Sequence, residues 1–283
     1  DTLRDIYYII LDQYASTSTL KEIYSFDNSE FINYLSNRGF YVASQSRSNY
    51  QTTSHSLASS LNMEYINYLS DKVGKESSDR AAVYAMLQDY KVWRFLRSKG
   101  YKFIHLGSLW HPTSRNKYAD MNINLAYSLE FLQLLSSTTM FHPIDSGLGI
   151  TGFADFRLMQ RKRVLYKFEK LAEIPDLKEP TFVFAHMVIP HGPYVFDRNG
   201  NFVTEEEEKK RTEIVNYVDQ LIFVNKRIEM LIDRLLSNSQ VPPIIILQAD
   251  EGPYPQRYYR YELDKRNFNW GQATEAELRQ KMR

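Results

Sequence analysis

The sequence predicts an α/β fold, in which a mostly parallel sheet lies between helices on both of its faces. Short apolar runs, typical of buried strands, alternate along the chain with longer segments whose apolar residues recur at helical spacing. Several of these runs are followed directly by polar residues, as parallel strands often are at the edge of the sheet that binds ligands. The composition agrees, because 43% hydrophobic and 24% charged residues in a chain of 283 are typical of a globular protein.

The N-terminal half begins with an apolar run at 5–14, which predicts a buried strand. Residues 27–40 predict a helix, because an Asp or Asn can cap its start, the apolar spacing is helical and Gly39 ends it. The patterns that follow predict a strand at 40–44, a helix at 54–69, an amphipathic helix at 80–101 and a strand at 101–107.

In the C-terminal half, residues 244–247 are Ile, Ile, Ile and Leu, and we expect this run to be an interior strand with both faces covered. The patterns before it predict a helix at 120–139, a loop at 140–152, a basic helix at 153–174, a buried strand at 181–191 and one long helix at 204–236. The last residues, 273–283, have a helix-like composition.

Several functions are excluded or disfavoured by composition. The net charge of +1 gives no overall field that attracts nucleic acid. The absence of cysteine excludes disulfides, thiolate metal sites and a cysteine nucleophile. No apolar run approaches the ~18 residues of a membrane span, and no signal-peptide pattern opens the sequence. We find no internal repeat or linker and therefore predict one domain over 1–283, cut short at its C-terminus.

Four polar residues lie at or just after the carboxyl ends of the predicted strands. Asp12, His191, Asp250 and Glu251 stand where the carboxyl ends of parallel strands meet, so we expect them to converge on one edge of the sheet. Asp250 and Glu251 repel each other, so they either share a cation or are solvated in a polar loop. A single Asp after a strand is also a common helix cap.

Five blocks of the sequence resemble the sulfatase-like branch of the alkaline phosphatase superfamily. The blocks occur in the order and spacing of that family, and they are "YIILDQYAS", "SNYQTTSHSLASSLNM", "AHMVIPHGPYVFD", "YVDQLIFVNKRIEMLID" and "IIILQADEGP". The chain is most similar to bacterial membrane-anchored sulfatase-like domains, relatives of lipoteichoic acid synthase and phosphoethanolamine transferases. The resemblance implies an alkaline phosphatase-like three-layer α/β/α fold over nearly the whole chain.

The resemblance also implies a catalytic metal site. Its ligands would be Asp12, Thr53, Asp250 and, in place of the family's histidine, Glu251. Thr53 would be the nucleophile, and Thr52 is the alternative; the family's Thr-x-x-Ser-Leu spacing matches Thr53. A threonine hydroxyl needs a base or a metal to become a good nucleophile, which agrees with this placement. His191 would bind the transferred group or protonate the leaving oxygen.

Further residues are predicted to line the substrate site or to be structural. The candidates for substrate binding are Asn49, Tyr50, His111, Arg115 and Tyr194. We expect His186, inside the strand at 181–191, to be packed in the core, and the basic residues 161–163 to be a solvated helix face.

The predicted cofactor is one divalent metal ion. An all-oxygen set of ligands favours Mn²⁺, Mg²⁺ or Ca²⁺, with Zn²⁺ possible. The family's sulfatases carry a Cys/Ser-x-Pro-x-Arg motif and a second Asp after the first, whereas this chain has no such motif and Gln13 follows Asp12. Sulfatase activity is therefore disfavoured.

The function predicted from the sequence is that of a metal-dependent phosphoryl-type transferase or hydrolase with a threonine nucleophile. Its substrate would be a small-molecule phosphodiester or a lipid or glycan headgroup. The alternatives are a sulfate-ester or other phosphoester hydrolase, and a catalytically inactive binding or scaffold domain, which Glu251 in place of histidine suggests. The resemblance implies an extracytoplasmic location with a membrane tether outside this sequence. The acceptor and the oligomeric state stay open.

Overall fold

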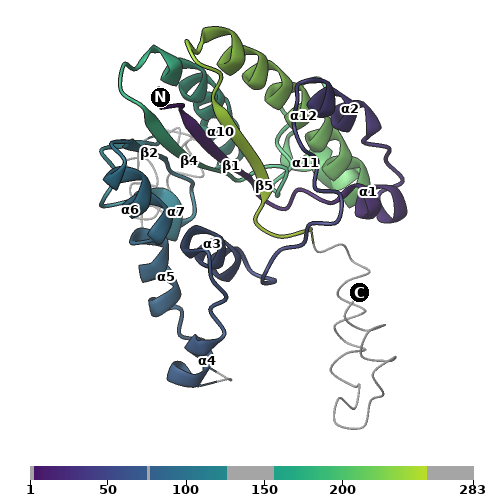
Figure 1. The fold of residues 1–283 in the computed structure, drawn as a ribbon. Coiled ribbons are helices and arrows are strands. Elements are labelled where there is room, and N and C mark those ends of the chain that lie inside the picture. The colour runs from purple at the N-terminus through teal and green to yellow at the C-terminus, as the bar shows by residue number, and fades with distance from the viewer. Residues whose placement is uncertain (1–2, 75–76, 126–155, 254–283) are drawn as a thin grey trace, which may run out of the picture. The chain divides into compact units, whose positions relative to one another are not determined.

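The computed structural model describes residues 3–74, 77–125 and 156–253 (Figure 1). The chain divides into two compact units, Asp1–Gly252 and Pro253–Arg283, and all described residues except Pro253 belong to the first. The part of the predicted helix beyond residue 125, the predicted loop at 140–152 and the helix-like C-terminal stretch lie outside the described residues.

A five-stranded sheet forms the centre of the described part of the chain. Its strands are ordered β3 (Met121–Ile123), β2 (Lys102–Leu106), β4 (Thr181–Met187), β1 (Ile6–Leu11) and β5 (Ile244–Ala249). Every pair of neighbouring strands is parallel. This confirms the predicted α/β fold with a parallel central sheet.

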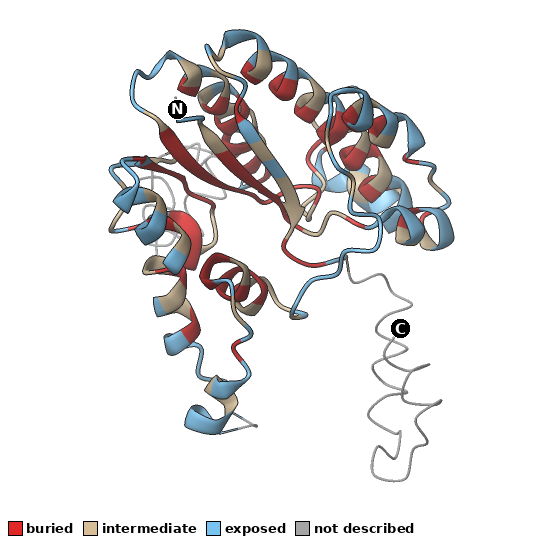
Figure 2. Ribbon diagram, in the orientation of Figure 1, coloured by how far each residue is buried: buried red, intermediate tan, exposed pale blue. Residues whose placement is uncertain are grey.

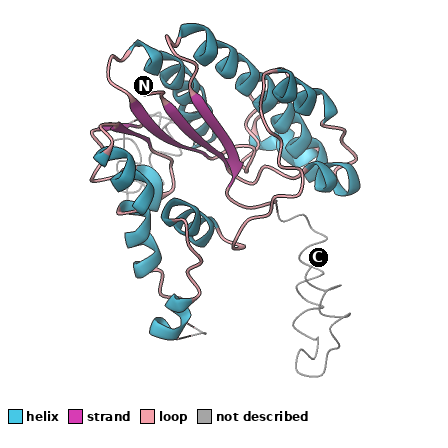
Figure 3. Ribbon diagram, in the orientation of Figure 1, coloured by secondary structure: helices cyan, strands magenta, loops and turns pink. Residues whose placement is uncertain are grey.

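Helices cover both faces of this sheet, as Figure 3 shows. Successive strand residues point to opposite faces, so the apolar strand residues divide into two cores. One core lies under α2 (Ser29–Asn37), α10 (Phe156–Glu173) and α12 (Glu213–Asn238). The other lies under α3 (Thr53–Asn62), α5 (Ala81–Gln88) and α6 (Lys91–Ser98). Figure 2 shows the buried residues along the sheet and on the inner sides of these helices.

Shorter elements connect these layers. They are α1 (Thr17–Ile23), α4 (Tyr68–Val73), α7 (His111–Ser114), the 3-10 helix η1 (Ile174–Asp176) and α11 (Glu205–Lys210). Among the helices of the described residues, none is long and apolar enough to cross a membrane.

Three predicted long helices are each interrupted. The helix predicted at 54–69 ends at Asn62, because Met63 adopts a left-handed conformation (φ 54°). The helix predicted at 80–101 is split into α5 and α6 by extended backbone at 89–90. The helix predicted at 204–236 is α11 followed by α12, whose start is capped by the Thr212 side chain accepting from the Val215 N–H. Local caps and turns override the apolar spacing at these points.

Some strand and surface predictions are wrong. Residues 40–44 form no strand, whereas residues 121–123, predicted to be helical, form β3. β5 is the outer strand of the described sheet, so Ile244 and Ile246 are 40% and 44% exposed instead of covered. Arg163 was expected in a solvated helix face, yet it is buried, because α10 turns this side toward the sheet.

Candidate functional site

Three side chains from neighbouring strands meet at the carboxyl edge of the sheet. Asp12 follows β1 and Asp250 follows β5, and the register pairs Leu11 with Ala249, so the two carboxylates come side by side. His186 pairs with Ile10, two residues before Asp12, and therefore shares its face of the sheet. One ligand atom from each of Asp12, His186 and Asp250 lies within 4.8 Å of the other two. His186 Nε2 lies 3.3 Å from Asp12 Oδ2.

The polar atoms of this cluster lack partners although they are buried. Asp12 is 6% exposed, and His186 and Asp250 are 0% exposed. Asp12 Oδ1, His186 Nε2 and Asp250 Oδ2 have no hydrogen-bond partner. Each such group destabilises the folded protein by about 1–3 kcal/mol unless it is satisfied. Two carboxylates and an imidazole are ligands that a divalent transition metal accepts, so these residues fit the metal ion that the sequence predicts.

The electrostatics of Asp250 reflect the same crowding. Burial, and secondly the charge of Asp12, raise the pKa of the Asp250 carboxyl above its usual value. His186, the Gln13 N–H and the Thr53 hydroxyl act in the opposite direction. The Asp250 carboxylate is thus a stronger base than an exposed aspartate, and a bound cation would relieve its repulsion with Asp12.

The turn after β1 fixes both carboxylates. The Asp12 N–H donates to Met187 O at 3.0 Å, which extends the β1–β4 pairing by one residue. Gln13 then adopts a left-handed conformation (φ 57°), and its N–H donates to Asp250 Oδ1 at 3.0 Å. The His191 N–H donates to Asp12 O at 3.2 Å. The backbone around Asp12 therefore links the ends of three strands.

Thr53 reaches this cluster from the start of α3. It is the first residue of that helix, and its hydroxyl lies near enough to the Asp250 carboxylate to lower the pKa of that group. Thr52 Oγ1 instead lies 2.7 Å from His55 Nδ1. The Ser56 hydroxyl donates to the backbone oxygen of Asp250, which joins α3 to the end of β5. Of the two threonines, Thr53 is thus the one whose hydroxyl acts on the Asp250 carboxylate.

Glu251 is buried next to Asp250, but it does not belong to this three-residue group. Its role as a metal ligand stays a prediction. The expectation for His186 was incomplete, because this residue is packed in the core and also belongs to the cluster. One signal in the sequence was the alternation of Phe182, Phe184 and His186, which puts a polar side chain last on an aromatic face.

His191 lies on the loop after β4, and one buried side chain of α12 holds this loop. His191 is half-buried, and its Nδ1 lies 2.5 Å from Gly192 O. Gln220 bonds the loop at five points, between 2.9 and 3.4 Å. Its Nε2 donates to the oxygens of Pro190, His191 and Pro193, and its Oε1 accepts from the N–H groups of Val195 and Phe196.

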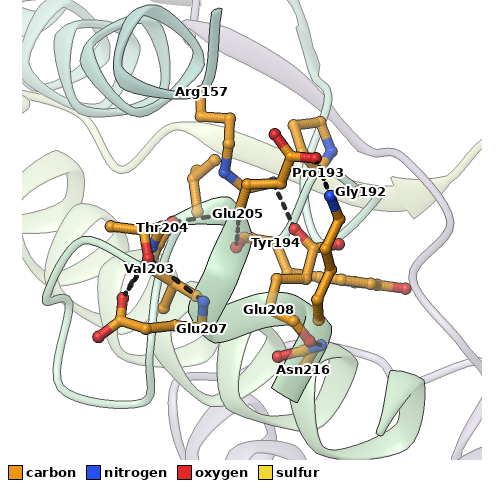
Figure 4. A network of polar contacts seen from close by, with 12 residues as sticks. Arg157, Gly192, Pro193, Tyr194, Val203, Thr204, Glu205, Glu207, Glu208 and Asn216 are labelled. Carbon is orange, nitrogen blue, oxygen red and sulfur yellow. Dashed lines mark hydrogen bonds and ion pairs between the residues drawn. The ribbon is translucent and has the colours of Figure 1, made fainter. Parts of the chain in front are cut away.

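A second network holds the same loop farther along. Figure 4 shows Arg157 between the loop at Gly192–Tyr194 and the glutamates of α11. Arg157 Nη2 donates to Tyr194 O at 2.7 Å and Val203 O at 3.1 Å, and Nη1 pairs with the Glu208 carboxylate. Asn216 Nδ2 donates to Glu208 O at 2.9 Å. α10, α11 and α12 thus all fix the segment that carries His191.

The family resemblance implies a catalytic role for His191, and small displacements of a catalytic group can lower a rate about 10–100-fold. We therefore expect Gln220→Leu to lower the turnover number by this factor without changing metal affinity. Steady-state kinetics and metal titration would measure the two effects. Gln160→Leu is the matched control, because Gln160 is also buried but makes one bond to this region, to Val188 O. Equal kinetic losses in the two variants would contradict a specific role of Gln220.

The five predicted substrate-binding residues are not part of the cluster. Asn49 donates to Ser59 Oγ at 2.8 Å. Tyr50 donates to Asn67 Oδ1 at 2.6 Å and accepts from the Ile66 N–H at 2.7 Å, so both brace the segment around α3. His111 and Arg115 are exposed at α7, and Tyr194 is half-buried on the His191 loop. Substrate binding by these residues stays a prediction.

Comparison with known proteins gives one result. The family model described as Sulfatase matches residues 4–278 of this chain. No curated protein is similar enough to match it. The matched region contains the whole cluster and Thr53.

Proposed function

Because the chain belongs to the sulfatase family, within the alkaline phosphatase superfamily, we propose that it is a metal-dependent transferase or hydrolase that uses Thr53 as its nucleophile. The family acts on sulfate or phosphate esters as a hydrolase or transferase. For this chain we propose a phosphodiester, such as a lipid or glycan headgroup ester. The five sequence blocks that resemble membrane-anchored relatives support an extracytoplasmic site of action with a membrane tether.

One observation carries this proposal. The hydroxyl of Thr53 lies beside Asp250, which belongs to a buried cluster with three unsatisfied ligand atoms. Asp12, His186 and Asp250 would hold the metal ion, which when bound lowers the pKa of a hydroxyl and neutralises charge on the ester. The Asp250 carboxylate would accept a hydrogen bond from the Thr53 hydroxyl and orient its oxygen.

The chain's other residues act on the substrate. Thr53 starts a helix of ten residues, whose free N–H groups favour an anion beside the nucleophile. His191, tied by its N–H to Asp12 O, would contact the transferred group or protonate the leaving oxygen. These roles require the loop after β4 to stay in place, which the bonds of Gln220 achieve.

A sulfate-ester hydrolase is the second candidate, because the matching family model is described as Sulfatase. The absence of cysteine and of a Cys/Ser-x-Pro-x-Arg motif argues for phosphoesters. The two candidates can be distinguished by measuring how fast the same metal-loaded protein cleaves bis(p-nitrophenyl) phosphate, p-nitrophenyl phosphate and p-nitrophenyl sulfate. The diester should be cleaved fastest, whereas fastest cleavage of the sulfate would overturn the phosphodiester assignment.

The donor set leads to a prediction of metal preference. The imidazole of His186 adds a nitrogen to the oxygens expected from the sequence, and this favours Zn²⁺ or Mn²⁺ over Mg²⁺ or Ca²⁺. A preferred ion at about 100 times its Kd adds about 2.7 kcal/mol to the stability of the folded state. After chelation and re-addition, Zn²⁺ or Mn²⁺ should therefore raise Tm by roughly 5–10 °C. Equal shifts with Ca²⁺ would contradict this preference.

A further inference from the structure

The buried side of His186 is occupied by a chain of hydroxyl groups. Thr113, in α7, places Oγ1 2.8 Å from His186 Nδ1. Ser108 Oγ lies 2.7 Å from Thr113 Oγ1 and also donates to Trp110 O at 3.3 Å. Thr113 and Ser108 are both buried, so water does not compete for these bonds. This row of hydroxyl groups begins at His186 Nδ1, the ring nitrogen that faces away from Asp12, and ends at the backbone oxygen of Trp110.

Two arrangements of protons are compatible with these distances. In the first, Ser108 donates to Trp110 O and accepts from Thr113, so Thr113 must accept from a protonated Nδ1 of His186. In the second, Ser108 donates to Thr113, Thr113 donates to Nδ1, and the His186 proton is on Nε2. That proton would be buried without a hydrogen bond, because Nε2 has no partner despite lying 3.3 Å from Asp12 Oδ2. The first arrangement satisfies every donor and is therefore favoured.

The first arrangement also directs the imidazole lone pair. With the proton on Nδ1, the lone pair of Nε2 faces the carboxylates of Asp12 and Asp250. A lone pair beside two carboxylates is stable when a cation lies among them. The rest of the residue is fixed as well, because Lys167 Nζ donates to His186 O at 2.7 Å and the Trp110 ring packs edge-on against the imidazole.

We propose that Thr113 is a positioning residue of the metal site, which together with Ser108 keeps the His186 proton on Nδ1 and presents the bare Nε2 to the ion. The inference rests on the proposed function, because it assigns a metal to Asp12, His186 and Asp250. It extends the site to α7 and to the loop between β2 and α7, which contribute no residue to the three-residue cluster. Hydrogen-bond partners of this kind orient a ligating imidazole and increase its basicity.

The test is to remove bound metal with a chelator and then titrate the protein with Zn²⁺ or Mn²⁺, with the affinity measured by calorimetry. Thr113→Val removes the hydroxyl at similar volume and should weaken affinity about 10–100-fold. Thr113→Ser keeps the hydroxyl and should bind within a factor of about three of wild type. Thr181→Val is the matched control, because Thr181 is also buried and its hydroxyl donates to Asp5 Oδ1, but at the opposite end of β4.

The outcomes separate the inference from the proposed function. If wild type binds and Thr113→Val binds equally well, the inference is overturned while the metal site stands. If wild type binds neither ion, both are overturned. Ser108→Ala breaks the same row of hydroxyl groups one step farther from His186. It should also weaken affinity, which keeps the test open if Thr113→Val does not fold.

A spectroscopic readout tests the tautomer itself. In ¹⁵N-histidine-labelled protein loaded with Zn²⁺, two-bond ¹H–¹⁵N correlations should show the His186 proton on Nδ1, with the signals assigned through His186→Gln. A proton on Nε2 in the loaded wild type would overturn the inference.

Discussion

Asp250→Asn is expected to abolish metal binding and turnover, and at the same time to make the metal-free protein more stable. The substitution keeps the shape of the side chain and an oxygen that accepts from the Gln13 N–H. It removes the negative charge that burial and Asp12 make unfavourable, as the raised pKa of Asp250 indicates. About 1 kcal/mol of relief would raise the Tm of the metal-free protein by roughly 2–4 °C.

The pH dependence of this effect has a definite sign. The pKa of Asp250 is higher in the folded than in the unfolded protein, so its ionisation destabilises the folded state as pH rises through the folded pKa. At acid pH, where the carboxyl is protonated in both states, the difference from Asp250→Asn should vanish. The stability advantage of the variant should therefore grow from acid to neutral pH.

Thermal melts with and without Zn²⁺ or Mn²⁺, across this pH range, would measure both effects. Asp5→Asn is a suitable control, because Asp5 is a hydrogen-bonded carboxylate at the other end of β1, where it accepts from the Thr181 N–H at 2.8 Å. That variant should lose stability and keep the metal-induced shift. A full metal-induced shift in Asp250→Asn would show that the cluster does not hold the ion.

Thr53→Ala should abolish turnover and any covalent phosphoryl-enzyme intermediate while the fold is kept. Thr53 carries the hydroxyl beside Asp250, so its removal deletes the proposed nucleophile and leaves the three candidate ligands in place. The stability loss should be about 1 kcal/mol or less, as for other hydroxyls at helix starts. Thr53→Ser should keep part of the activity.

Single-turnover labelling with a ³²P diester, followed by peptide mapping, would measure this prediction. Thr52→Ala is the matched control, because Thr52 is the adjacent threonine and its hydroxyl contacts His55 instead of Asp250. Label on Thr52, or normal turnover in Thr53→Ala, would assign the nucleophile elsewhere.

The fold class and four of the five strands of the described sheet could be predicted from the sequence. Apolar runs at 5–14, 181–191 and 244–247 are long enough and apolar enough to be strands whatever their neighbours are. Because parallel strands end at a common edge, Asp12 and Asp250 could be placed together without knowing the strand order. The Sulfatase family could also be identified from the sequence blocks.

The tertiary structure decided the features that depend on which residues are neighbours. His186 joins the cluster because β4 pairs with β1 in a register that puts it opposite Ile10, and a sequence does not specify register between distant strands. Which of the two threonines lies beside Asp250 depends on the direction in which the first turn of α3 faces, and the nucleophile itself stays a proposal. The support of His186 by Thr113 joins residues 73 positions apart. Local patterns determined the elements, whereas the packing of the sheet determined which polar atoms meet without a partner.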